Sequence, residues 1–399
     1  MYELLLLIPA FFLFLFVCRL YCKKSFDHIT FICLIWLIVS ICGYIYTTTS
    51  ILYIGKGNVT IGSVIFLILM YYITMKPIEN SRALTKANYT INGSKILVWA
   101  MYIIAICSYL PFLENMFHLL SGNTITSVAD NYDAREEVTT FDARSHMTWL
   151  GARFNSVTLL VKYITPILLM NYIAQTKKKY WVVIGLIMGI FNPSIFMFNM
   201  GSRWVAIEDI LFLIFLFLLY KNCLSLKTRY FVQIAFSVVL SVIVMGLIYI
   251  TIGRFGDSNY NISEWLYRYI GEGFANFSTD MWYADHTANG MQVFRVFYDD
   301  AISRLNTLMG IRMYVFYTYV GDIFADWGIY GCIIVCIIIG ILGKLIFAKK
   351  KYDICSVFAM SMYCKILLTG FTYIIYINTL TELTIGSIFF YLVKVSTKK

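Results

Sequence analysis

Three arginines stand where a long apolar run meets a polar segment of the sequence: Arg203, Arg254 and Arg312. A guanidinium group is planar, permanently charged and carries a fork of N–H donors, so it fits a phosphate better than the point charge of lysine does. Guanidinium groups that are held in place beforehand neutralise developing charge without a metal. We therefore predict that these three residues bind a phosphate or pyrophosphate group.

Four further residues could move a proton. His286 ends the stretch Trp282-Tyr283-Ala284-Asp285-His286, and Glu272 stands between two glycines. Asp322 and Asp326 are four residues apart, so they share one face of a helix. Each of the four is a candidate catalytic acid or base. His286 could instead be simply solvated, and Asp322 and Asp326 could cap a helix or pair with Arg312, so these alternatives stay open.

The elements that position these residues are predicted to be membrane helices. The chain has 399 residues, of which 60% are hydrophobic and 14% charged, with a mean hydropathy of +0.74. A soluble domain carries about 25% charged residues, so a soluble enzyme, a disordered chain and a disulfide-stapled secreted module are excluded. The apolar runs are too long and continuous for barrel strands. The sequence predicts an all-α polytopic bundle that forms a single membrane domain over 1–399.

Eleven apolar runs approach the roughly 20 residues that a helix needs to cross a bilayer. They are 3–18, 29–46, 58–75, 96–113, 154–174, 181–199, 204–220, 231–252, 328–347, 354–376 and 379–394. Two long polar segments, 114–153 and 253–312, interrupt the series. The second contains an amphipathic stretch over 264–270 that would suit a helix lying in the membrane interface.

Charge predicts the orientation of these runs. With the N-terminus outside, eighteen of the 32 basic residues fall in the cytoplasm, including the lysine triplets 177–179 and 349–351. This agrees with the positive-inside rule, and it places both long polar segments outside and the C-terminus in the cytoplasm. The net charge of +10 is thereby explained without a nucleic-acid partner.

The two basic residue types divide unequally between the sides. Fifteen of the eighteen cytoplasmic basic residues are lysines, whereas nine of the ten exterior ones are arginines. The positive-inside rule treats both types alike, so it does not predict this split. A binding site for an anion on the exterior side would explain the excess of arginine there. Ion pairs with exterior acidic residues are the alternative explanation for several of these arginines.

Two lysines and a glycine pair inside the apolar runs are also notable. A charge inside a membrane helix is a functional hypothesis by default. Lys162 either reaches a phosphate or snorkels to the surface, and the sequence names no partner for Lys365. Gly185 and Gly189 form a GxxxG pair, which predicts close helix packing.

Three stretches carry a resemblance to a known family. They are Gly201-Ser202-Arg203-Trp204, the nine residues from Tyr269 to Phe277, and the thirteen residues from Tyr319 to Gly331. With the helix count and the long late exterior loop, the chain resembles the oligosaccharide repeat-unit polymerases of the O-antigen and capsule type (the Wzy-like family). The resemblance implies a fold like that of the type C glycosyltransferases.

The resemblance also implies an activity and a location. The chain would be a multi-pass protein of the bacterial cytoplasmic membrane. On the outer face it would join oligosaccharide units carried on undecaprenyl pyrophosphate, acting on membrane lipid and working beside a chain-length regulator. No nucleotide-binding loop or zinc-ligand spacing is present in the sequence, so no metal or cofactor is predicted. Trp265, Tyr269, Trp282 and Tyr319 are then predicted to stack on sugar rings, with interfacial anchoring as their alternative role.

Two other functions stay open. An O-antigen ligase would transfer the glycan to another acceptor, and it differs from a polymerase only in that acceptor. A polysaccharide transporter or flippase would show internal repeats and broken helices in two halves, and the sequence has no visible repeat.

Overall fold

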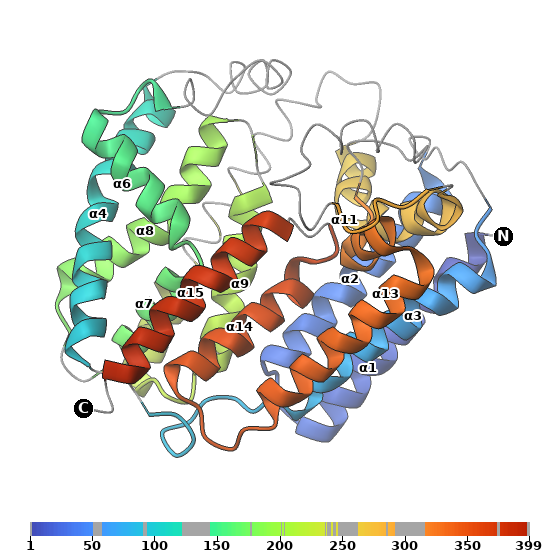
Figure 1. Cartoon of the computed structure of the whole chain (residues 1–399), viewed down its shortest axis with the longest axis horizontal. Coiled ribbons are helices and arrows are strands. Elements are labelled where there is room, and N and C mark those ends of the chain that lie inside the picture. The colour runs from blue at the N-terminus through green and yellow to red at the C-terminus, as the bar shows by residue number, and fades with distance from the viewer. Residues whose placement is uncertain are drawn as a thin grey trace. The chain divides into compact units, whose positions relative to one another are not determined.

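The computed structural model describes 2–50, 58–90, 94–121, 144–175, 178–200, 202, 204–235, 237, 241, 245, 262–284, 286–291, 316–372 and 376–396 (Figure 1). Within these ranges every regular element is a helix, apart from two isolated β-bridges. The predicted all-α class is therefore confirmed for the part of the chain that the structure describes.

Six described helices are long and apolar enough to cross a membrane. They are η1 with α1 (Tyr2–Lys23), α2 (His28–Thr49), α3 with η2 (Ile61–Asn80), α4 (Lys95–Leu120), α8 (Tyr180–Asn199) and α13 (Thr318–Phe347). The bent pair of α6 (Trp149–Leu160) and α7 (Ile164–Ala174) makes a seventh if it counts as one span. These helices support a membrane protein, and the finer count of eleven spans stays a prediction.

The remaining described helices are shorter or less apolar. They are α9 (Trp204–Tyr220), α11 (Ile262–Thr279), η4 (Met281–Tyr283), α14 (Ile354–Thr369) and α15 (Tyr376–Ser396). Most of the predicted run over 231–252 and most of the two long polar segments lie outside the described residues.

The chain divides into two compact units. Unit 1 comprises Met1–Arg82, Ser263–Lys350 and Ala359–Leu383, and unit 2 comprises Ala83–Ile262, Lys351–Phe358 and Thr384–Lys399. The single membrane domain stays a prediction.

Unit 1 is built around aromatic side chains whose polar atoms are satisfied. The rings of Trp36 and Tyr71 lie 4.8 Å apart, and Tyr319 packs against both. The Trp36 indole donates to the carbonyl of Leu367 at 2.5 Å, and the Tyr71 hydroxyl donates to Thr318 at 2.8 Å. A buried indole or phenol needs such a partner. These contacts tie α2, α3, α13 and α14 together, and α1, α2, α3 and α13 lie side by side in Figure 1.

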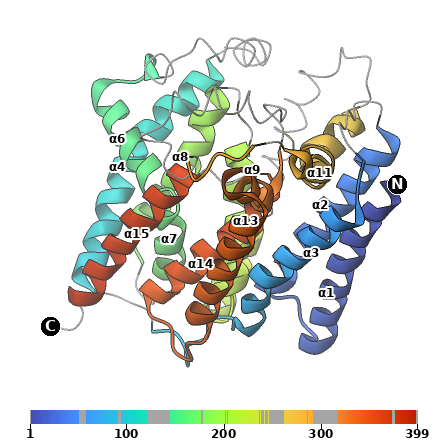
Figure 2. The same cartoon turned by 45° about the vertical axis from the view of Figure 1, so that its right-hand side comes forward.

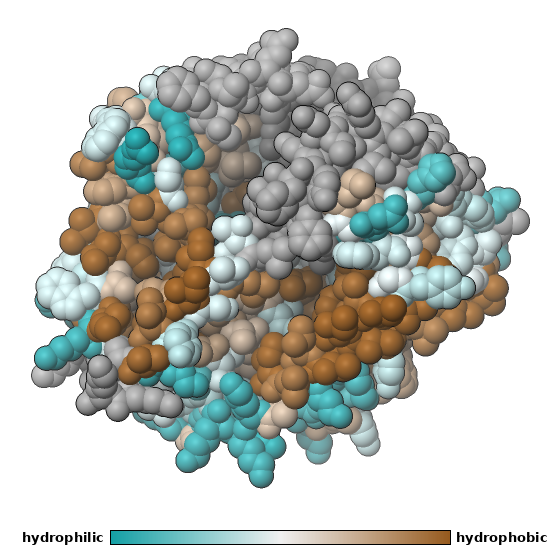
Figure 3. All heavy atoms as spheres, in the orientation of Figure 1, coloured by the Kyte–Doolittle hydropathy of each residue, from teal (hydrophilic) through white to brown (hydrophobic). Residues whose placement is uncertain are grey.

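One face of α13 in unit 1 is apolar and exposed. Figure 3 shows this face as a hydrophobic band, and its exposed residues are Ile334, Ile337, Ile338, Ile341, Leu342 and Leu345. The exposed lysines 349 and 350 follow where the helix ends. An apolar stripe that gives way to lysines is what a helix needs where it leaves the lipid on the cytoplasmic side. We call this end of unit 1 the lysine-rich end.

Unit 2 contains the closest helix packing that the sequence predicts. A Cβ added to Gly185 would lie 2.7 Å from the side chain of Ala105, and one added to Gly189 would lie 2.4 Å from the Ser108 hydroxyl. Only glycine lets α8 approach α4 so closely. The GxxxG prediction is confirmed, and Figure 2 shows α4 and α8 running beside each other.

The predicted run over 154–174 does not form one straight helix. The helices α6 and α7 are bent by 80° across 161–163. Pro166 stands in the first turn of α7, where a missing N–H is tolerated, but it cannot donate to the carbonyl of Lys162. The break therefore falls at Lys162, whose side chain is buried.

Candidate functional site

The helix α11 is wedged into unit 1 by its two glycines. A Cβ on Gly271 would lie 2.1 Å from the backbone nitrogen of Gly43 on α2, and a Cβ on Gly273 would lie 2.7 Å from the carbonyl of Phe371. Residues 271–280 are all buried, whereas the first part of α11 is partly exposed. The Gly-Glu-Gly stretch that carried the family resemblance thus has a packing function, because it lets two backbones touch.

Glu272 is fixed by hydrogen bonds on both carboxylate oxygens. Its Oε2 accepts from Nε of Arg268 at 3.2 Å, and its Oε1 accepts from the backbone N–H of Phe316 at 3.2 Å. Glu272 is buried, with 4% of its surface exposed. This arrangement ties the start of α13 to α11, and the predicted catalytic role of Glu272 stays a prediction.

The first residues of α13 adopt an unusual backbone. Thr318 has a φ of 70°, in the left-handed region that a β-branched residue rarely occupies. Its N–H donates to Thr372 at 3.0 Å, and the N–H of Tyr319 donates to Gly370 at 2.7 Å. Strain of this kind persists only where the surroundings determine it. No sequence signal reveals this feature, because threonine is not a residue that favours a positive φ.

A second irregularity in α13 separates the predicted carboxylates from the long apolar helix. Gly328 has φ 67° and ψ −170°, so α13 breaks there. Helical donors are lost at such a break, and the carbonyls of Ala325 and Asp326 accept instead from Ala288 at 2.9 Å and Gly290 at 3.1 Å. Asp322 and Asp326 therefore belong to a short first segment of α13, and the segment 286–291 packs against the break.

His286 lies at the start of that segment and is exposed. Two residues later, Ala288 is hydrogen-bonded to Ala325, one residue before Asp326. The side chain of Asp326 is fully buried and that of Asp322 is partly exposed. The structure thus brings the His286 segment to the carboxylate-bearing turn, whereas Glu272 lies at the beginning of α13. We call His286, Asp322 and Asp326 the break cluster.

The predicted sugar-binding aromatics take different positions in unit 1. Trp265 carries the Arg268 guanidinium over its ring at 5.3 Å, and the Tyr269 ring lies 5.5 Å from that of Phe316. Trp282 is partly exposed and packs on Phe324 at 5.9 Å. Tyr319 is fully buried in the aromatic core, and its hydroxyl is hydrogen-bonded to Thr74.

The predicted pyrophosphate-binding residues Arg203, Arg254 and Arg312 lie outside the described residues. Asp285, the neighbour of His286, lies outside them as well. Their roles stay predictions from the sequence.

Unit 2 contains a buried ionic cluster that sequence reasoning found only in part. Lys162 Nζ lies 2.6 Å from Glu208 and 3.4 Å from Asp209, and the Ser194 hydroxyl donates to Asp209 at 2.5 Å. All three charged side chains are less than 10% exposed. Lys162 therefore neither snorkels nor is turned outward. The adjacent acids Glu208 and Asp209 inside an apolar run were the signal that could have named its partners.

A polar network of asparagines lies in the same unit. Asn192 donates to Asn155 and to Thr158, both at 2.7 Å, and Asn115 donates to Asn192 at 2.9 Å. His146 is hydrogen-bonded to Asn115 at 2.9 Å and stacks on His118 with ring centroids 4.0 Å apart. Burial, and then the charge of His118, lower the pKa of His146 to about 4. Its imidazole is therefore neutral near pH 7.

The buried Lys365 also receives a partner, because its Nζ lies 3.7 Å from Glu382. The separation of these residues in the sequence explains why the pairing could not be predicted from one apolar run.

No family model, curated protein or solved structure matches this chain. The chemical possibilities therefore come from the geometry. Unit 1 offers the exposed side chain of His286 on a segment that is hydrogen-bonded to the turn carrying Asp326, together with partly exposed aromatic side chains. An exposed imidazole suits proton transfer to or from a bound hydroxyl group. Unit 2 offers a sealed set of opposite charges.

Proposed function

We propose that this chain is a metal-independent glycosyltransferase that polymerises oligosaccharide repeat units carried on undecaprenyl pyrophosphate. The reaction takes place on the exterior face of a bacterial cytoplasmic membrane, with the N-terminus outside. The observation that carries the proposal is the break cluster, because it presents the exposed His286 at the end of α13 remote from the lysine-rich end. Positive charge marks the cytoplasmic side, so the break cluster belongs outside.

The reaction is a substitution at the donor's anomeric carbon. The terminal hydroxyl of the acceptor unit attacks this carbon, and a new glycosidic C–O bond forms. The bond between the anomeric carbon and the pyrophosphate oxygen breaks, so that undecaprenyl pyrophosphate leaves with the electron pair. His286 accepts the hydroxyl proton, a contribution of typically 10²–10⁴-fold in rate.

Asp322 and Asp326 act on His286 and the acceptor through their negative charge. The partly exposed Asp322 stabilises the imidazolium that forms when His286 takes the proton. Glu272 serves to hold α11 and the start of α13, because both of its oxygens already accept hydrogen bonds. Trp265, Tyr269 and Trp282 stack on sugar rings. The buried Tyr319 supports them from the core.

The leaving pyrophosphate needs compensating charge. Arg203, Arg254 and Arg312 supply it as preorganised guanidinium groups. Arg312 stands four residues before the described Phe316, whose N–H donates to Glu272. The nearness in sequence of Arg312 to a fixed backbone supports its role in binding.

The test is chain extension in cells. Deleting the gene should leave surface glycans with a single repeat unit, and Arg203→Lys or Arg312→Lys should do the same when the protein still inserts. Arg82→Lys, at an exposed cytoplasmic position, is the matched control and should extend chains normally. Normal chain length in both exterior variants would contradict the pyrophosphate role.

His286 is tested separately. His286→Gln should slow chain extension by about 10²–10⁴-fold without lowering the thermal stability, because the side chain is exposed. Thr287→Val, in the same segment, keeps the methyl that faces Gly328 and should retain activity. A His286→Gln protein with wild-type rate would remove the imidazole from the mechanism.

Two other functions predict different products. A ligase mutant would accumulate long lipid-linked polymer, whereas the polymerase mutant accumulates single units. A transporter or flippase is favoured by one specific observation, the broken span α6–α7 with the buried Lys162 at its break, since broken helices commonly line transport sites. A flippase mutant would show neither short nor long glycans at the surface.

A further inference from the structure

A cavity of about 450 Å³ lies within unit 1 near the lysine-rich end. It is formed between α1, α2, α3 and η2, and its floor is the buried pair Ile29 and Cys33 on α2. Its outer walls are Phe14 and Tyr72, which are 65% and 44% exposed. Because α1 and α3 are both candidate membrane spans, a cavity with exposed apolar walls opens toward lipid.

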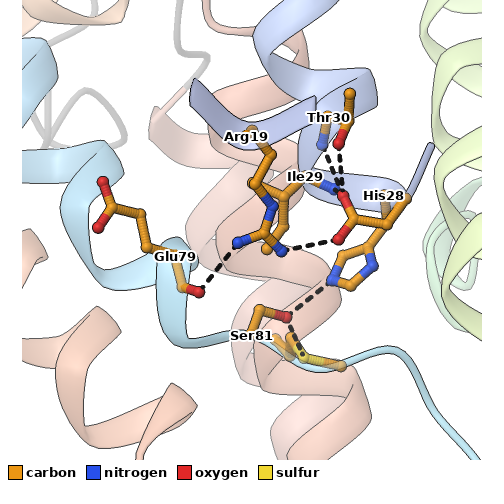
Figure 4. A network of polar contacts seen from close by, with 8 residues as sticks. Arg19, His28, Ile29, Thr30, Glu79 and Ser81 are labelled. Atoms are coloured by element: carbon orange, nitrogen blue, oxygen red, sulfur yellow. Dashed lines mark hydrogen bonds and ion pairs between the residues drawn. The ribbon is translucent and has the colours of Figure 1, made fainter. Parts of the chain in front are cut away.

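Arg19 lines this cavity and carries its deepest positive charge. Figure 4 shows the guanidinium reaching from the Asp27 carboxylate, at 2.7 Å, to the backbone carbonyl of Glu79, at 3.2 Å. The side chain is 10% exposed. Its Nε is buried and has no hydrogen-bond partner among the described residues. A buried donor without a partner is energetically costly. The Nε–H of Arg19 could therefore accommodate one further hydrogen-bond acceptor.

The carboxylates near the cavity are already engaged. Asp27 also caps α2 through Thr30, with the N–H at 2.8 Å. Burial alone would raise the pKa of Asp27, but the hydrogen bonds from Arg19 and Thr30 and the charge of Arg19 together lower it to about 2. Glu79 pairs with Lys76 at 2.8 Å. Asp27 therefore stays ionised at neutral pH, and both carboxylates are already engaged by basic side chains.

The balance of charge around the cavity is positive. Among the residues that line the cavity, Arg19 and Lys76 are basic, whereas Glu79 is the acidic one. Lys76 lines the cavity and also lies over the Tyr72 ring, with its Nζ 5.5 Å from the centroid. The cavity lining thus combines two cationic side chains with apolar ones such as Phe14, Leu15 and Tyr72.

We propose that this cavity binds an anionic phospholipid of the cytoplasmic leaflet. The lipid phosphate accepts a hydrogen bond from Nε of Arg19 and interacts with Lys76, while an acyl chain lies along Phe14, Leu15 and Tyr72. Basic pockets between membrane helices on the cytoplasmic side suit anionic headgroups. The apolar wall favours a lipid over free phosphate, because a free ion would leave that wall without contact. The proposal does not rest on the glycosyltransferase activity.

Binding is measured on the full-length protein by the thermal stabilisation that added lipid produces. Phosphatidylglycerol should raise the Tm more than phosphatidylcholine does, and inorganic phosphate should raise it little. Arg19→Gln should weaken phosphatidylglycerol binding by at least about tenfold, as expected for a charged hydrogen bond. Lys350→Gln, an exposed lysine outside the cavity lining, should bind the lipid as the wild type does.

A second variant keeps the test informative if Arg19→Gln fails to fold. Cys18→Trp fills the cavity from α1 and leaves Arg19 intact. It should also lose the preference for phosphatidylglycerol. The proposal is overturned if both stable variants keep wild-type lipid binding, if phosphatidylcholine stabilises equally, or if inorganic phosphate alone gives the full shift.

Discussion

Two apolar helices of this protein are interrupted, and their breaks differ in kind. In unit 1, α13 breaks at Gly328 through its backbone, with φ 67°, and the exposed His286 lies on the segment beside it. In unit 2, the α6–α7 break surrounds Lys162, whose ammonium lies 2.6 Å from Glu208 inside the protein. The first break leaves polar side chains accessible, and the second encloses them.

The two breaks are therefore expected to have different roles, one in activity and the other in stability. A glycine break arises from the backbone alone and needs no buried charge, and the exposed His286 lies on the segment that packs against it. A break that holds buried charges depends on their pairing, because an unpaired ion inside the protein is strongly unfavourable. Substitutions at the Lys162 break should therefore affect folding first, and substitutions beside Gly328 should affect activity first.

The largest effect is expected for Lys162→Met. Removing one partner of a buried ion pair leaves the other charge uncompensated, which costs about 3–5 kcal/mol. The free energy of unfolding, measured in detergent, should fall by that amount. Adding Glu208→Gln and Asp209→Asn to the same chain should recover much of the loss. If Lys162→Met is as stable as the wild type, the α6–α7 break does not depend on its buried ion pairs.

A smaller loss is expected for Gly328→Ala. The φ of 67° with ψ −170° favours glycine, and a non-glycine residue there costs about 1–3 kcal/mol. The added methyl would also lie 3.2 Å from the Thr287 methyl and so disturb the segment of His286. Chain extension should fall together with Tm, whereas Ile334→Ala, at an exposed position of α13, should change neither by much.

Gly271→Ala tests whether backbone contact positions the unit 1 site. The new Cβ would overlap Gly43 on α2, and overpacking of this kind costs about 1–3 kcal/mol. Because α11 must shift, activity should fall even in molecules that remain folded. Ser263→Ala, at the exposed start of α11, is the control. Full activity of Gly271→Ala would show that the close backbone contact between α11 and α2 does not position the site.

The smallest effect is a pH dependence in unit 2. The pKa of His146 is lowered to about 4 in the folded protein, whereas an unfolded histidine titrates near about 6.5. The unfolded chain therefore binds more protons between these values, and stability should decline as the pH falls from about 6.5 toward 4. His146→Gln should flatten this part of the Tm–pH curve. If the slope of the Tm–pH curve is unchanged in His146→Gln, a group other than His146 causes the pH dependence.

Much of the helical architecture could be predicted. The runs 29–46, 181–199 and 204–220 agree closely with α2, α8 and α9, because apolar length alone selects a helix in lipid. The run 96–113 was placed correctly but is too short, because α4 continues to Leu120, inside the predicted loop 114–153. The close packing at Gly185 and Gly189 could also be predicted, because the GxxxG pattern lies within one short stretch of sequence. The break at Lys162 was missed because hydropathy averages over a single buried charge.

The candidate site was only partly predictable. The sequence indicated His286 and the two aspartates of α13, since residue type and spacing suffice for that. It gave no sign that Glu272 is held on both oxygens or that Tyr319 is buried, because both follow from contacts between α11, α13 and α3.

The amino-acid sequence by itself was enough to predict an all-helical chain with helices apolar enough to span a membrane, since lipid selects helices of a set length and apolar composition. Only the tertiary structure decided which polar groups are sealed and which are open. Lys162 became a buried ion-pair partner and His286 an exposed group because distant segments pack on one and leave the other uncovered. That outcome depends on burial, which is a property of the packed helices and not of any single one.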